Sequence, residues 1–224
     1  MGTTQVAVFN RALIALGERR LASIGEPRKA QRVLTDLWGD CVQFCLEQGM
    51  WNFAMASGSV AGTGSSGLGY SYAFAKPSDL VHLFALSESG TYDPPLTGRD
   101  YADAGGSWFA NVATLYGRYT SNAAGNGGNL ALWTMTFTSY LVHVLAAWAA
   151  VDLTGSQAVA DAMEQRAARY LVGALAIDSV PMLPGLLPFN AEARSRIAEG
   201  ANAQPIYVDP FRAALPGPAQ SGAQ

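Results

Sequence analysis

The hydrophobic period of this chain changes twice along its length. Before about residue 50 and again after about residue 129, apolar side chains recur every three or four residues, as on one face of an α-helix. Between these segments, YSYAFAKPSDLVHLFAL at 70–86 begins with the two-residue alternation of a strand and is interrupted at Pro77, which cannot donate a ladder hydrogen bond. The pattern therefore predicts helices at both ends of the chain and β-structure in its middle.

Four segments carry the helical pattern. Residues 28–48 show the strongest amphipathic stripe, and residues 4–16 form a shorter one. Residues 129–152 are apolar on most sides, which predicts a central helix, and a fourth helix follows a cap at Thr154 or Ser156. The wide apolar faces of the second and third helices predict that these two pack against each other.

The middle of the chain is rich in turn-forming residues. Strand-like runs occur at about 70–75, 80–86 and 112–119. Residues 57–69 hold five glycines and four serines, and residues 121–129 read SNAAGNGGN, so both segments are predicted to be flexible loops.

These patterns together predict an α+β fold that is mainly α. We expect an antiparallel bundle of about four helices, a small β insertion between helices two and three, and an extended C-terminal arm. The first and second halves of the bundle are expected at 1–55 and 129–178, and the β-rich insertion at 56–128. The arm is expected at 179–224, where seven prolines prevent one long helix.

Composition and charge favour an assembly over an isolated subunit. Half of the residues are hydrophobic and only 14% are charged, a low share for a chain covered by water on all sides. The net charge of −3 gives the whole chain no electrostatic attraction for nucleic acid. Residues 1–32 nevertheless carry +4 and residues 33–117 carry −6. The basic segment 1–32 is interpreted as a solvated face, or as a contact for an acidic partner or for another copy of the chain.

Motifs that carry chemistry are missing from the sequence. There is no nucleophile elbow, phosphate loop or zinc helix, so we expect no catalytic residue, no cofactor, no metal site and no enzyme activity. Cys41 and Cys45 share one helix face and are interpreted as buried free thiols, with a metal pair as the alternative. His82 and His143 are interpreted as hydrogen-bonded core histidines, with a base or a ligand as the alternative.

Membrane insertion and secretion are not expected. The longest apolar stretch, at 140–151, is shorter than the roughly 20 residues that span a bilayer. No secretory signal peptide is visible, so the protein is expected to be soluble and made in a cytoplasm.

Four segments in a fixed order resemble a known family. FNRALIALGERRLASI at 9–24 pairs an Asn-Arg helix with a Leu-Gly end, and the segment at 29–54 contains a second helix and the Trp-Asn-Phe-Ala that follows it. The strand at 70–86 contains Pro-Ser-Asp, and LAAWAAVDLTGS at 145–156 ends in a Leu-Thr-Gly-Ser turn. These features resemble the tail tubular protein A family, the adaptor proteins of short-tailed bacteriophages. The resemblance covers about residues 5–178 and departs from the family at its glycine-rich loops and where the usual proline before the tryptophan is replaced by methionine.

The resemblance implies a structural virion protein. Members of this family form a ring, usually of twelve copies, that connects the portal protein to the tail nozzle protein. The implied location is the tail or neck of the virion, after synthesis in the cytoplasm of the bacterial host. Viral DNA would pass through the ring without sequence-specific binding, and no membrane or cofactor is implied.

The expected interfaces lie at both ends of the chain. Arg11 and Trp51 are candidate contacts in the helical part, and the segment PIYVDPF is the candidate docking element of the arm. The candidate residues of the arm are Ile206, Tyr207, Val208, Phe211 and Arg212.

Two other classes of protein stay open. One is a neck or head-completion protein of a long-tailed phage, which shares the ring but joins another partner. The other is a small helical ligand-binding protein or enzyme with His143 and Asp152 in a central pocket.

Overall fold

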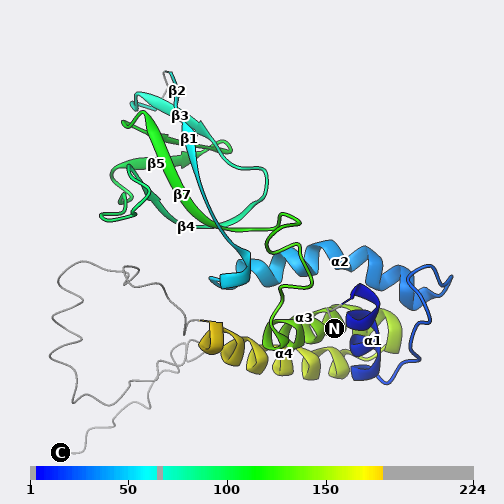
Figure 1. Ribbon diagram of the computed structural model, residues 1–224. Helices are drawn as coiled ribbons and strands as arrows, with labels where there is room; N and C mark the ends of the chain where they lie inside the picture. The colour runs from blue at the N-terminus through cyan, green and yellow to red at the C-terminus, as the bar shows by residue number, and fades with distance from the viewer. Residues whose placement is uncertain (1–3, 65–67, 179–224) are drawn as a thin grey trace, which may run out of the picture. The chain divides into compact units, whose positions relative to one another are not determined.

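A computed structural model of the chain describes residues 4–64 and 68–178 (Figure 1). The described helices are α1 (Gln5–Ala15), α2 (Lys29–Glu47), α3 (Met135–Thr154) and α4 (Gln157–Asp178), with a short 3₁₀ turn at Asn52–Ala54. The described strands are β1 (Met55–Ala61), β2 (Thr63–Gly64), β3 (Tyr72–Ala75), β4 (Leu80–Ser87), β5 (Tyr101–Ala104), β6 (Ser107–Ala110) and β7 (Thr114–Ser121).

The prediction of a mainly helical bundle with one small β insertion is wrong. The fold is a mixed α/β fold: 44% of the described residues are helical and 22% lie in strands, so β-structure is a major component. The strands form two antiparallel sheets, ordered β1-β7-β4 and β2-β3-β6-β5. Their apolar side chains bury a core of their own around Phe74, Leu86, Trp108, Ala110 and Leu115.

The missed strands explain this error. The glycine- and serine-rich segment 57–69, predicted to be a loop, supplies most of β1 and all of β2. β1 pairs with β7 along seven residues, and Gly58 lies opposite Gly117 in that register. Such a strand is held by backbone hydrogen bonds and needs few apolar side chains, so hydrophobic alternation does not reveal it.

The helix α3 is the centre of the helical part, as its sequence predicted. It contacts α1, α2 and α4, and twelve of its twenty residues are buried. The predicted packing of the second helix against the third is therefore confirmed. α3 begins six residues later than predicted because Thr134 is its N-cap, with Oγ1 accepting from the backbone N–H of Phe137 at 3.2 Å. It ends at Gly155, whose φ of 69° favours glycine.

Within the described part of the chain, α3 is the one helix long and apolar enough to cross a membrane. The burial of α3 gives that composition another explanation, because 67% of the apolar window is enclosed by the protein itself. A core helix passes the same test of length and hydropathy, so the apolar character of α3 follows from its central place in the fold.

Aromatic rings fill the space between α2, α3 and the 3₁₀ turn. The ring of Phe137 is at the centre, with the rings of Trp51, Phe53 and Trp133 around it at centroid distances of 4.8, 4.9 and 5.2 Å. The three pairs are edge-on contacts, the favoured arrangement for aromatic side chains.

The segment between β7 and α3, predicted to be a flexible connection at 121–129, is instead a series of hydrogen-bonded turns. Gly127 is buried, and its N–H donates to the carbonyl of Ser121 at 3.0 Å. The Gly127 carbonyl accepts from the indole Nε1–H of Trp133 at 2.8 Å. The glycines of this segment therefore serve close backbone approach and not flexibility.

The predicted C-terminal arm lies outside the described residues. The same holds for Ile206, Tyr207, Val208, Phe211 and Arg212. The predicted boundaries at 55, 128 and 178 stay predictions.

Candidate functional site

The two candidate interface residues of the helical part are engaged within the chain. Arg11 on α1 donates from Nη2 to the hydroxyl of Ser139 on α3 at 2.9 Å, and its Nη1 lies 3.7 Å from the sulfur of Met135. Trp51 is completely buried, and its indole Nε1–H donates to the carbonyl of Cys45 at 3.0 Å. Trp51 is thus a core residue with no surface to offer a partner, and Arg11 joins α1 to α3.

Some basic residues near the N-terminus form contacts within the chain, and others are exposed. One nitrogen of Arg28, Nη1, donates to the carbonyls of Arg19 and Arg20 at 3.2 and 3.0 Å and lies 3.6 Å from a carboxylate oxygen of Glu26. These contacts hold the loop between α1 and α2. The ammonium group of Lys29 donates to the backbone carbonyl of Asp152 on α3.

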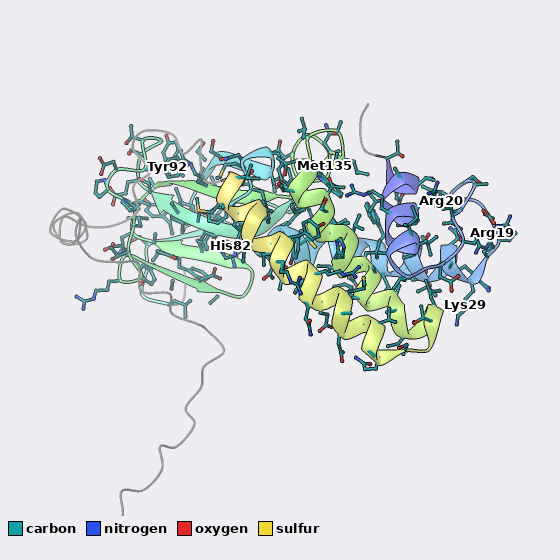
Figure 2. All side chains as sticks on the ribbon, turned by 90° about the horizontal axis from the view of Figure 1, so that it is seen from below. Arg19, Arg20, Lys29, His82, Tyr92 and Met135 are labelled. Atoms are coloured by element: carbon teal, nitrogen blue, oxygen red, sulfur yellow. The ribbon has the colours of Figure 1, made fainter. Side chains whose placement is uncertain are left out.

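Four cationic residues along this loop and the start of α2 are exposed, including Lys29. We call them the basic loop surface: Arg19, Arg20, Lys29 and Arg32. Figure 2 shows Arg19, Arg20 and Lys29 at the same end of the helical part. This surface can attract an acidic partner or a phosphate backbone, with a strength that falls as salt screens it.

The two cysteines are buried free thiols, as predicted. The Sγ of Cys41 lies 3.9 Å from the carbonyl oxygen of Leu141 on α3. Burial, and then the neighbouring Cys41 thiol, raise the pKa of Cys45 well above its ordinary value. Burial also raises the pKa of Tyr140, with the Cys45 sulfur as a further cause. A thiol that stays protonated is a poor nucleophile and metal ligand, and no group of three metal-ligating side chains occurs in residues 4–64 and 68–178.

The two histidines occupy different environments. His82 on β4 is exposed, so its predicted place in the core is wrong, and its ring lies 5.0 Å from that of Phe84. His143 on α3 is half-buried, and its Nδ1 lies 2.7 Å from the carbonyl oxygen of Ser139. A carbonyl only accepts, so Nδ1 carries the proton and, in the neutral ring, Nε2 holds the lone pair.

The structure contradicts the alternative arrangement in which His143 and Asp152 share a central pocket. The two residues are separated along α3 by nine positions, about 13 Å of helix. Asp152 is exposed, and its backbone carbonyl accepts from Lys29.

His143 does line a different pocket, which opens at α3 and α4. The pocket has a volume of about 400 Å³, and its described lining is His143, Arg166, Arg169 and Tyr170. The rings of His143 and Tyr170 are stacked with their centroids 4.7 Å apart. The sequence does not reveal this site, because a tyrosine among the apolar residues of a helix is typical of a core position, whereas 42% of Tyr170 is exposed. Two arginines and a tyrosine within one turn of α4 were the available signal.

Asp178 at the end of α4 is a buried carboxylate outside this pocket. One of its oxygens accepts from the backbone N–H of Asn52 at 2.6 Å, and the Asn52 amide donates to the Asp178 carbonyl. Burial raises the pKa of Asp178, and the hydrogen bond from Asn52 opposes that shift. The contact ties α4 to the 3₁₀ turn that precedes β1.

The residues that carry the family resemblance hold backbone segments in place. The amide of Asn10 makes two hydrogen bonds to the backbone of Leu21, accepting from its N–H at 2.7 Å and donating to its carbonyl at 3.0 Å. Asp79 accepts from the hydroxyls of Ser121 and Tyr119, the latter at 3.4 Å, and so joins the start of β4 to the end of β7. Burial, and then the Asp79 charge, raise the pKa of Tyr119.

Replacing Asp79 with alanine should lower the free energy of unfolding by about 1–3 kcal/mol, because two partly buried hydroxyls lose their acceptor. The control is Asp103→Ala, which removes a carboxylate from an exposed ion pair with Lys76 and should change stability by less than about 1 kcal/mol. Urea denaturation monitors both variants. Equal losses would show that Asp79 does not anchor β4.

No protein-family profile matches the chain, and a search of curated proteins finds no similar sequence.

Proposed function

We propose that the protein is a structural subunit of a phage particle, a head-to-tail adaptor that forms a ring between the portal protein and the tail nozzle. The observation that carries the proposal is the role of the residues on which the resemblance to the tail tubular protein A family rests. Asn10, Trp51 and Asp79 all stabilise the fold: each is engaged in the chain's own hydrogen bonds or core. A motif made of scaffold residues suits a family whose members share an architecture and not a reaction.

The exposed apolar side chains support an assembled subunit. Met135 and Val172 are each 70% exposed, and Ile177 is 56% exposed. Val172 and Ile177 lie in the last two turns of α4. Covering such side chains with a neighbouring subunit stabilises an assembly by about 25 cal/mol for each Å² of apolar surface removed from water.

The charge distribution supports a channel role for part of the surface. Asp36, Asp40 and Glu47 are exposed on α2, within the acidic stretch of the sequence. Like charge prevents DNA from sticking to a wall that it must slide past. The basic loop surface supplies the opposite charge for contacts with an acidic neighbour.

The proposal predicts a ring. Light scattering after size-exclusion chromatography should report a discrete assembly of about twelve chains, either for the protein alone or after mixing with the portal protein of the same phage. Negative-stain images of that fraction should show rings. A stable monomer that neither assembles nor joins the portal protein would contradict the proposal. A ring that joins the neck of a long-tailed particle would favour the neck-protein alternative.

A further inference from the structure

The pocket at α3 and α4 is an open hollow, since three of its four described lining residues are exposed. Its volume of about 400 Å³ falls in the range of about 300–1,000 Å³ typical of ligand pockets. A single inorganic anion would occupy only a small part of it. Each member of its described lining, His143, Arg166, Arg169 and Tyr170, can bind a ligand through charge, a hydrogen bond or a ring face.

The described lining of the pocket carries a net positive charge. Arg166 and Arg169 are three positions apart on α4, so their side chains start about 5–6 Å from each other on the same face. Neither arginine forms an ion pair with any residue that the structure describes, and no carboxylate belongs to the described lining. By contrast, Arg28 and Lys76 each lie against a carboxylate.

Two guanidinium groups match a phosphate monoester better than a carboxylate. A phosphate monoester carries a charge of about −1.5 to −2 at neutral pH and presents three terminal oxygens. A carboxylate carries a single charge that one arginine fork can satisfy alone. The pair Arg166 and Arg169 offers two forks, so the second one would be left without a partner on a carboxylate.

The aromatic wall of the pocket consists of the two stacked rings of His143 and Tyr170. The Nδ1–H of His143 donates to the carbonyl of Ser139, which sets the orientation of the imidazole. Tyr170 stacks on that imidazole with 26° between the two ring planes. Because Tyr170 is 42% exposed, part of its ring is open to a flat group of a ligand.

We propose that this pocket binds a small phosphate monoester with a flat ring, of the chemical class of a nucleoside monophosphate. The phosphate lies on Arg166 and Arg169, and the flat ring lies against Tyr170. This site is independent of the adaptor role: ring formation and ligand binding are measured separately, so either can fail alone.

Isothermal titration of the full chain with adenosine 5′-monophosphate, adenosine and inorganic phosphate tests the site. The monophosphate should bind with a stoichiometry of one per chain, and adenosine and phosphate should each bind at least about 10-fold more weakly, since each lacks one half of the contact. The double variant Arg166→Gln/Arg169→Gln should weaken monophosphate binding at least about 10-fold. Tyr170→Leu should weaken monophosphate binding and leave phosphate binding unchanged.

The matched control is Arg19→Gln/Arg20→Gln, which removes the same charge from two exposed arginines of the basic loop surface (Figure 2). It should change monophosphate binding by less than about 2-fold. All of the side chains that are varied are exposed. Thermal melts should therefore show that each variant is folded. No saturable binding of the monophosphate, equal affinity for adenosine, or equal weakening in both double variants would overturn the proposal.

Discussion

Replacing Trp51 with alanine is expected to lower the free energy of unfolding by about 3–5 kcal/mol, the usual cost of deleting a buried aromatic ring. Trp51 is completely buried and packs edge-on against Phe137, with the ring centroids 4.8 Å apart. Its indole also supplies the hydrogen bond to the Cys45 carbonyl. The cavity left by alanine would open at the meeting point of α2, α3 and the 3₁₀ turn.

A second substitution at the same position separates packing from hydrogen bonding. Trp51→Phe keeps a ring but removes the donor and part of the volume, so it should cost about 1–3 kcal/mol. Urea denaturation followed by far-ultraviolet circular dichroism measures both variants. A loss below about 1 kcal/mol for Trp51→Ala would mean that the indole does not belong to the core.

Adding one methyl group at Gly127 is expected to cost about 3 kcal/mol. A Cβ at this position would lie 2.3 Å from the carbonyl oxygen of Ser121 and 3.0 Å from the Cβ of Ala54. The nearest of these atoms belongs to the backbone, so the turn itself would have to move. Its movement would also disturb the hydrogen bond between the Gly127 carbonyl and Trp133.

Gly125, two residues earlier in the same segment, is the matched control. A Cβ at Gly125 meets no atom within 4 Å, so Gly125→Ala should change stability by less than about 0.5 kcal/mol. Denaturant midpoints of the two variants give the comparison. If both glycines tolerate alanine equally, the segment is the loose connection that its composition predicted.

The helices could be predicted from the sequence where burial is one-sided or complete. The stripe at 28–48 gives α2, observed at Lys29–Glu47, within one residue at each end. The apolar run at 129–152 gives α3 and its central place. These predictions succeed because the period of the apolar side chains is a direct consequence of which face is buried.

The extent of the β-structure could not be predicted in the same way. β1 and β2 consist mostly of small residues, and their partners β7 and β3 lie far away in the sequence or beyond a turn. Pairing through the backbone does not require alternating apolar and polar side chains, so strands of such small residues lack the two-residue hydrophobic period. Gly58 lies in a strand opposite Gly117, but residue propensity alone predicts a loop at this position.

The candidate pocket depends on tertiary contacts that no local pattern reports. His143 on α3 and Tyr170 on α4 are stacked only because the two helices are neighbours. The sequence did predict that Cys41 and Cys45 are buried free thiols, because their four-residue spacing places both on one face of α2, which is the buried face. The sequence does not separate a core role from an interface role for Trp51, because an aromatic residue just after a helix suits both.

The antiparallel pairing of β1 with β7 places the two ends of the β-rich segment next to each other. Met55 lies opposite Thr120, so the points at which the chain leaves and re-enters the helical part are neighbours. β4 pairs with β7 and contacts α2, so this strand cannot be replaced freely. Changes of length in the loops of the β2-β3-β6-β5 sheet need not alter the separation of β1 and β7, so these loops are where evolution or a protein engineer can vary the molecule at least cost to its helices.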